Sequence, residues 1–265
     1  MTVKRRKYGT GHAYYVDGPD GVEVKVPGVT TIIGDTTPKD GLTDWAARSA
    51  ADYAIDNWDE LLAMRPSQRH KALHFAYRQD RDKAGRRGTE VHRLAERLVA
   101  FEEVIKPEEL AGHIDSYVSF LDAMNPEPVA VELVVVNRTL RYCGTADLVC
   151  DLGEVMAEEV IPPGRWLLDL KTARSGIFGE TALQVCGYAR AEAYLDPETG
   201  EERPMDALKI EHCGAVHITA DGWELRPLDT GEATWEHFRH LRWIYDRLPE
   251  MRASVRPAVA VPIPA

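Results

Sequence analysis

The segment WLLDLKTARSGIF, residues 166–178, places an acid and a base inside an apolar run, at Asp169 and Lys171. The period of two in a β-strand puts these two side chains on one face of a sheet and Leu168 and Leu170 on the other. A carboxylate beside an ammonium group can hold a cation or place a charge next to a phosphate. A strand that simply ends in solvent gives the same pattern, so the pair needs support from the rest of the chain.

Two further acids interrupt the neighbouring apolar runs. Glu132 lies within VAVELVVV, and Asp147 lies within CGTADLVC. Carboxylates brought together in a sheet repel each other unless a cation lies between them or they share a proton. Hard oxygen ligands suit Mg²⁺ or Mn²⁺. Each acid alone fits a strand end or a salt bridge, whereas three acids and a lysine on successive strands favour a site for a divalent ion.

Two pairs of residues at helical spacing accompany these acids. Gly88 and His92 lie four residues apart in GTEVH, and Gln184 and Tyr188 lie four residues apart in QVCGY. Each pair therefore shares one helix face. A single histidine or a Gln/Tyr pair is usually structural. The informative feature is the order in which these residues and the acids occur.

That order resembles the RecB-like branch of the PD-(D/E)XK nucleases over about residues 86–195. The similarity rests on Gly88-x-x-x-His92, Glu132, Gly144-x-x-Asp147, Asp169-x-Lys171 and Gln184-x-x-x-Tyr188. The segment PGVTTIIGDTTPKDGLTDWAA is in addition similar to bacteriophage exonucleases of this branch. The resemblance implies an α/β fold with a restriction-endonuclease-like core. Such a core is a central mixed β-sheet flanked by helices, here with a small N-terminal accessory region.

The resemblance also implies a role for each matching position. The metal ligands would be His92, Asp147, Asp169 and the backbone carbonyl of Leu170, holding one or two Mg²⁺ or Mn²⁺ ions. Lys171 matches the active-site lysine, and Glu132 matches an acid found in many relatives. Gln184 and Tyr188 would stand beside the site, facing DNA or supporting the lysine. Arg86, Arg87 and Arg174 are the expected DNA contacts, although Arg174 is equally well a surface residue.

The chain departs from the family pattern in two places. An acidic insert makes the distance in sequence from Asp147 to Asp169 long. Some relatives hold an iron–sulfur cluster with one cysteine before the core and three after it. Here no cysteine precedes the core and only Cys213 follows Tyr188, so we expect no cluster. The four cysteines form no CxxC pair and are expected to be reduced thiols in the cytoplasm.

Charge is unevenly distributed along the 265 residues. The net charge of −11 argues against a protein that coats nucleic acid non-specifically, but residues 65–87 hold eight Lys/Arg against two Asp. KRRK at 4–7 is a second basic cluster. Such patches on an acidic protein suit a polyanion held at one groove, and a solvated helix face is the alternative. No apolar run approaches ~20 residues, so we expect no membrane span and a cytoplasmic location, in the host cell if a phage encodes the protein.

Periodicity and turn residues predict the elements that position these side chains. We expect short β-structure over 8–33, helices over 40–58, over 65–87 continuing from 89, over 106–124, 179–195 and 231–248, strands over 128–137, 140–152 and 165–173, a loop between the last two, and two strands within 208–228. The predicted organisation is an accessory region at 1–85, a nuclease core with its C-terminal helix at 86–249, and a flexible Pro/Ala tail at 250–265.

The sequence predicts a metal-dependent DNA exonuclease, a phosphodiester hydrolase of phage-type recombination or replication. No recognition helix or zinc finger is evident, which suits contacts to the DNA backbone and a free end rather than to bases. DNA and a recombination protein are the expected partners. Two alternatives stay open: a structure- or sequence-specific endonuclease on the same core, and a nuclease-like DNA-binding module without catalysis. The sequence leaves polarity, strand preference and oligomeric state undetermined.

Overall fold

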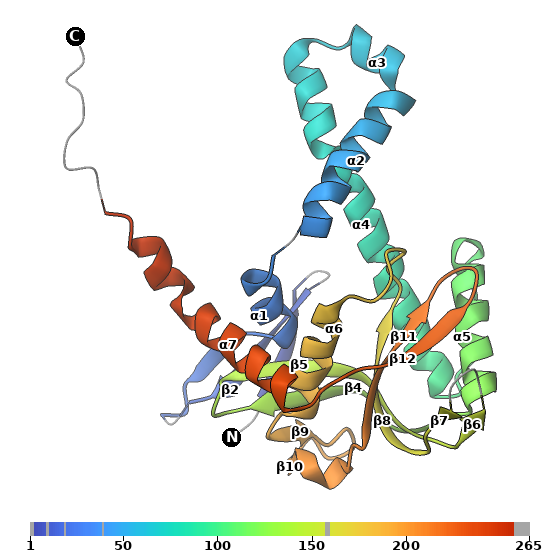
Figure 1. The fold of residues 1–265 in the computed structure, drawn as a ribbon, viewed down its shortest axis with the longest axis vertical. Helices are drawn as coiled ribbons and strands as arrows, with labels where there is room; N and C mark the ends of the chain where they lie inside the picture. The colour runs from blue at the N-terminus through green and yellow to red at the C-terminus, as the bar shows by residue number, and fades with distance from the viewer. Residues whose placement is uncertain (1–2, 9–10, 19, 39, 157–159, 257–265) are drawn as a thin grey trace.

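The computed structural model describes residues 3–8, 11–18, 20–38, 40–156 and 160–256. It has an α/β architecture in which a large mixed sheet carries helices on both faces (Figure 1). The seven strands of the sheet lie in the order β10-β9-β4-β5-β8-β11-β12. Their bounds are β4 Glu127–Asn137, β5 Tyr142–Leu152, β8 Gly164–Lys171, β9 Ala193–Leu195, β10 Glu202–Pro204, β11 His212–Ile218 and β12 Trp223–Pro227.

Among the described strands of the large sheet, β8 and β11 pair in parallel and the other neighbours pair antiparallel. The chain between these two strands carries α6, which covers the sheet as a parallel connection requires. The helices are α1 Val29–Thr36, α2 Asp40–Asp56, α3 Trp58–Ala63, α4 Pro66–Val99, α5 Ala111–Met124, α6 Gly179–Ala189 and α7 Glu232–Ala253, with short 3₁₀ turns at Glu108–Leu110 and Met205–Leu208.

Two hydrophobic cores lie on opposite faces of the large sheet. Leu167 packs with α1, α6 and α7 on one face, through residues such as Val29, Val185 and Phe238. Leu168 on the same strand packs on the other face with α4 and α5, where Phe120 is fully buried. The central strands therefore read as nearly continuous apolar runs because both faces are covered. The mixed sheet between helical layers confirms the predicted α/β class.

A second, three-stranded sheet forms at the N-terminus from β1 Val3–Tyr8, β2 Gly11–Asp17 and β3 Glu23–Val26. It packs on the large sheet through a small core in which Tyr14 meets Val136 and Cys143. The predicted β-structure is confirmed here only as far as Val26. Residues 29–33 are wrong as strand, because they begin α1, whose Val29, Ile32 and Ile33 are buried at helical spacing. Burial has overridden the strand preference of these β-branched residues.

Helices α2 and α3 and the first half of α4 form an arm that projects from the body (Figure 1). Helix α2 packs along α4, with Trp45 edge-on to Tyr77 at a ring-centroid distance of 6.5 Å. Helix α4 continues from the arm into the body without a break, so the boundary predicted at residue 85 lies inside this helix. The arm and the C-terminal half of α4 are therefore parts of one continuous helix.

Three further predictions differ from the structure. The helix expected over 179–195 ends at Ala189, and Ala193–Leu195 form β9 against β4. The expected loop after β5 contains two short paired strands, β6 Val155–Met156 and β7 Val160–Ile161, and residues 157–159 of this loop lie outside the described residues. Of the predicted tail, residues 250–253 belong to α7 and 257–265 lie outside the described residues. The turn at Asp221-Gly222 does join two antiparallel strands.

Two properties bear on the environment of the chain. None of the helices in the described ranges has the length and apolar character that a bilayer crossing requires. Cys143, Cys150, Cys186 and Cys213 are all free and buried. Burial raises the pKa of the first three thiols to about 12, so these groups stay protonated and act as packing residues.

Candidate functional site

The acid and the base of β8 form a contact that α6 completes. Asp169 is almost fully buried, and its Oδ2 lies 2.6 Å from Lys171 Nζ. The Gln184 side chain of α6 joins both residues, because its Nε2 donates to Asp169 Oδ1 at 2.7 Å and its Oε1 accepts from Lys171 Nζ at 3.0 Å. One amide therefore fixes both the carboxylate and the ammonium group. Asp169 and Lys171 are not a solvated strand end.

Tyr188 extends this network one helical turn along α6. Gln184 Nε2 also donates to the Tyr188 hydroxyl at 3.0 Å. The Tyr188 ring lies against β5 at Gly144, where an added Cβ would come within 2.4 and 2.7 Å of ring carbons. No real Cβ tolerates such distances, so this tyrosine position requires glycine at 144. The predicted pair Gln184 and Tyr188 does share one face, and that face is directed at Asp169.

Asp147 stands on the next strand, β5, with His92 of α4 on its other side. Asp147 Oδ2 accepts from the backbone N–H of Leu170 at 2.7 Å and lies 3.6 Å from His92 Nδ1. Residue 88 of α4 is glycine, and a Cβ added there would lie 3.1 Å from the Thr172 hydroxyl. The absence of a side chain at this position therefore lets α4 approach this closely. The structure therefore brings His92 and Asp147 together beside the Leu170 backbone, whose N–H, rather than its carbonyl, makes the contact to Asp147.

Glu132 interrupts the regular pleat of β4 directly opposite Asp147. It lies between the pairs Val131–Leu148 and Leu133–Ala146 and has a left-handed backbone with φ of 50°. The alternation changes phase here, since Ala130 and Leu133 contribute to the same core. A left-handed conformation costs a non-glycine residue about 1–2 kcal/mol. Strain of this kind gathers at functional sites, and here it turns the Glu132 carboxylate to the side of His92.

Burial is the main cause of the pKa shifts in the site, and the neighbouring acids add to it. Burial raises the pKa of Asp147 well above its usual range, and the charge of Asp169 raises it further. Burial also raises the pKa of Glu96, with Glu132 adding to the effect. Burial lowers the pKa of His92, so its imidazole is neutral near pH 7 and has a lone pair to offer. Asp147 and Glu96 are therefore the two acids of the site whose charged forms the surroundings disfavour.

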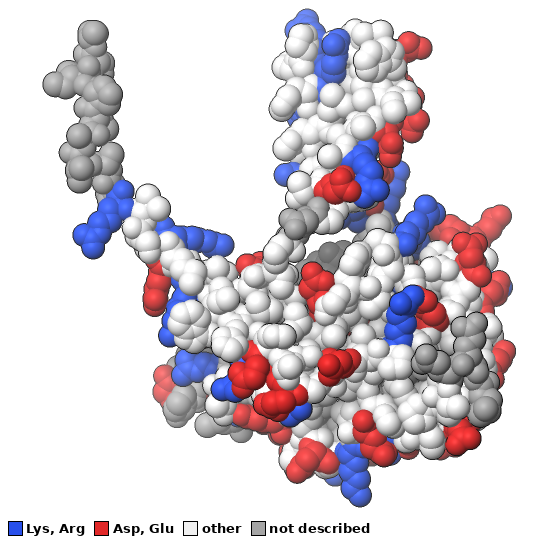
Figure 2. All heavy atoms as spheres, in the orientation of Figure 1, with Lys and Arg blue, Asp and Glu red and all other residues white. Residues whose placement is uncertain are grey.

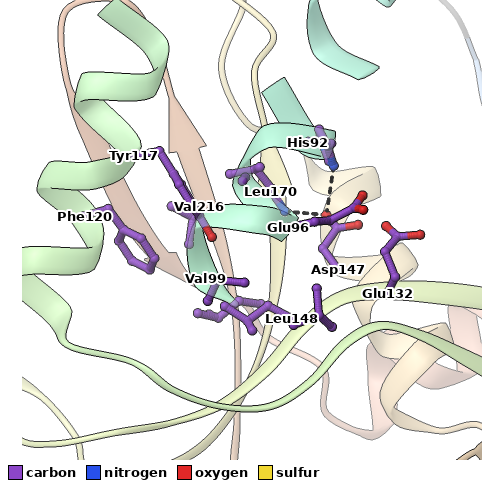
Figure 3. A pocket seen from close by; sticks show the side chains of 13 residues that line it. His92, Glu96, Val99, Tyr117, Phe120, Glu132, Asp147, Leu148, Leu170 and Val216 are labelled. Atoms are coloured by element: carbon purple, nitrogen blue, oxygen red, sulfur yellow. Dashed lines mark hydrogen bonds and ion pairs between the residues drawn. The ribbon is translucent and has the colours of Figure 1, made fainter. Parts of the chain in front are cut away.

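A cavity opens between this group and the core beneath α5 (Figure 3). His92, Glu96, Glu132 and Asp147 gather at one end of it, and Tyr117, Phe120 and Val216 line the other (Figure 3). Its volume is about 30 Å³. That space suits about one or two water molecules or a small ion and excludes a nucleotide. A polymer substrate would have to lie outside, at the mouth.

The donor set fits a hard divalent ion. The carboxyl groups of Asp147 and Glu132 and the neutral imidazole of His92 line a pocket of ionic size, and such donors suit Mg²⁺ or Mn²⁺, whereas Asp169 and Lys171 do not line it. Within the ranges that the structure describes, however, no three His, Cys, Asp or Glu side chains are arranged as a ready metal-binding group. The Asp169 oxygens contact Gln184 and Lys171.

The three arginines expected to contact DNA lie at two places. Arg86 is exposed on α4. Arg87 and Arg174 both lower the pKa of His113 on α5, after burial as the first cause, and so lie on the same side of the molecule. The Nε of Arg87 is buried without a hydrogen-bond acceptor. The structure therefore brings Arg87 and Arg174 together near α5 and leaves Arg86 apart.

Three residues of the site escaped the sequence analysis. Glu96 is four residues after His92 on α4, a spacing that signals a shared face. Arg5 of β1 pairs with Glu132 at 2.6 Å, a contact over a distance in sequence that no local pattern reveals. His217 of β11 is paired with Lys171 in the sheet register, and its Nε2 lies 2.7 Å from the Ala173 carbonyl oxygen. It anchors the loop that follows the lysine.

Comparison with known proteins found no family model and no curated protein sequence that matches this chain. The assignment of a function therefore depends on the residues of the site and their geometry.

Proposed function

We propose that this protein is a divalent-metal-dependent deoxyribonuclease with a PD-(D/E)XK core, acting as an exonuclease. The observation that carries the proposal is the joint engagement of Asp169 and Lys171 by Gln184, next to Asp147 on the adjacent strand. A single buried salt bridge would be a common structural feature. A carboxylate and an ammonium group held by one amide, next to a second carboxylate that has a raised pKa and lines an ion-sized pocket, are typical of phosphodiester hydrolysis.

His92, Asp147 and Asp169 are the residues that would hold Mg²⁺ or Mn²⁺, with the Leu170 carbonyl as a further ligand. The ion would neutralise phosphate charge and acidify a water molecule. Lys171 keeps its ammonium group beside Asp169 and Gln184, where it can orient the attacking water and stabilise the charge that develops on the phosphate. General base is the second role open to it. Gln184 and Tyr188 hold the lysine and Asp169 in place.

The exonuclease assignment is supported by the surroundings of the site. The pocket is too small for a base, and the basic segment 65–87 belongs to one long helix rather than to a base-reading module. Contacts to backbone phosphates fix position without reading sequence. An end of the DNA, rather than a particular sequence, is then the feature that selects the bond to be cut.

Digestion of end-labelled linear DNA and covalently closed circular DNA in Mg²⁺ tests this assignment. Progressive loss of the linear substrate with survival of the circle is the expected result. If circular DNA is cut as fast as linear DNA, or is cut at one discrete sequence, the protein is an endonuclease instead of an exonuclease. Binding of DNA without hydrolysis of either form would identify a nuclease-like binding module instead.

A further inference from the structure

Helix α4 connects the tip of the arm to the candidate site, because its 34 residues run without interruption from Pro66 to Val99. At 3.6 residues per turn, positions 18 residues apart share one direction around the helix axis. His74 therefore points in the same direction as His92 of the site. By the same arithmetic Arg81 lies within about 20° of that direction, Arg78 within about 40° and Lys71 within about 60°.

This face of the arm is open. Lys71, His74, Arg78 and Arg81 are all exposed, whereas Ala76, on the opposite side of α4, is buried. Helix α2 packs on α4, where Trp45 lies edge-on to Tyr77. The guanidinium of Arg78 lies 4.9 Å from the centroid of the Phe75 ring, which holds it on the helix surface. We call Lys71, His74, Arg78 and Arg81 the α4 stripe.

Charge divides the arm into two unlike sides. Residues 40–63 carry six acids and one arginine, whereas residues 65–87 carry eight Lys/Arg and two Asp. The acids belong to α2 and α3, and Figure 2 shows red side chains along the edge of the arm that these helices form. A polyanion that approaches this protein is therefore repelled by one side of the arm and attracted by the other.

We propose that the α4 stripe binds phosphates of the DNA at a distance from the bond that is cut. This inference rests on the proposed nuclease function and adds a binding surface to it. At 1.5 Å per residue, Arg81 lies about 16 Å and His74 about 27 Å along the helix from His92. These lengths correspond to about 5 and 8 base pairs of B-DNA at 3.4 Å each. The stripe thus holds DNA beyond the nucleotides at the cut, without reading sequence.

The test compares two variants of the full chain that each lose two exposed arginines. Arg78→Gln/Arg81→Gln removes the centre of the stripe. Arg48→Gln/Arg239→Gln is the matched control, because its arginines lie on α2 and α7 and, like Arg81, each pairs with a nearby acid on its own helix. Binding to duplex DNA is measured in Ca²⁺ over a range of salt concentrations. The unfolding midpoint of each variant confirms that it is folded.

Loss of two phosphate contacts makes the slope of log affinity against log salt shallower by about 2 and lowers affinity at ~0.1 M salt by about tenfold or more. The control keeps the wild-type slope. The loss of affinity in the Arg78→Gln/Arg81→Gln variant disappears for duplexes shorter than about 5 base pairs, because these do not reach Arg81.

Two results would contradict the inference in distinguishable ways. If the wild-type protein binds and cuts DNA but Arg78→Gln/Arg81→Gln binds long duplexes as the control does, the stripe is wrong and the nuclease assignment stands. If the wild-type protein neither binds nor cuts DNA, both proposals fail. A second variant, Arg78→Glu/Arg81→Glu, must bind long duplexes more weakly than the glutamine variant, and equal affinity of the two would also overturn the stripe.

Discussion

Replacing Asp147 with asparagine is expected to stabilise the metal-free protein while abolishing hydrolysis. The Asp147 carboxylate is disfavoured by burial and by the charge of Asp169, which together raise its pKa well above the usual range. An asparagine keeps an oxygen to accept the Leu170 N–H, now at 2.7 Å, and removes the charge. One pKa unit corresponds to about 1.4 kcal/mol. We therefore expect Asp147→Asn to raise the free energy of unfolding at pH 8, by an amount that grows with the upward shift of this pKa.

The sign of this effect fixes its pH dependence. Below the unfolded pKa, near ~3.9, the carboxyl is protonated in both states and the substitution changes little. Above the raised folded pKa the full penalty applies to the wild-type protein, so the gap between the two proteins widens as pH rises between these values. Added Mg²⁺ should stabilise the wild-type protein and narrow the gap, because the ion binds only where the carboxylate is present.

Urea unfolding of both proteins, in chelator and in Mg²⁺, measures these changes. Asp151→Asn is the control on the same strand. Arg165 lowers the pKa of Asp151, donating to its oxygens at 2.6 and 2.8 Å, so this substitution should destabilise the protein at pH 8. If Asp147→Asn destabilises the protein at pH 8, or if its effect does not vary with pH, the reasoning about crowded acids is refuted.

Three more substitutions separate the roles of other residues. Lys171→Ala should lower turnover by at least ~10²-fold with little change in DNA affinity, if the lysine acts on the transition state; a wild-type rate would overturn its assignment. Gly144→Ala should lower the free energy of unfolding by about 1–3 kcal/mol and reduce activity, because the added Cβ would displace Tyr188. Gly153→Ala should change neither, because the space around Gly153 is open. Equal unfolding midpoints for the two variants would contradict this reasoning. The free energy of unfolding of Glu132→Gly should exceed that of Glu132→Ala by about 1 kcal/mol, because only glycine relieves the strained φ of 50°. A lower stability of the glycine variant in urea unfolding would argue against strain.

The central part of the fold could be predicted because its strands are apolar runs with few polar interruptions. Those interruptions mark the site, since Asp147 and Asp169 stand on adjacent strands β5 and β8 and so must lie close together. The Gln184 and Tyr188 pair was recognisable from helical spacing. These patterns survive in the sequence because neighbouring strands and single helix faces obey fixed periods.

Other parts depend on contacts that no local pattern contains. Val29, Ile32 and Ile33 look like a strand but form a helix, since the space between α6 and α7 favours a helical face. Arg5 reaches Glu132 across more than a hundred residues. The change of pleat phase at Glu132 arises from a backbone conformation that glutamate seldom adopts, so composition gives no sign of it.

The most direct test of the account is hydrolysis of end-labelled DNA by the wild-type protein and by Asp169→Asn, each in Mg²⁺ and in excess chelator. Asp169 is joined to Lys171 and Gln184 and is a proposed ligand, so it links every part of the site. We predict that only the wild-type protein in Mg²⁺ releases label. Undiminished hydrolysis in chelator, or by Asp169→Asn in Mg²⁺, would contradict a metal-dependent nuclease centred on this residue.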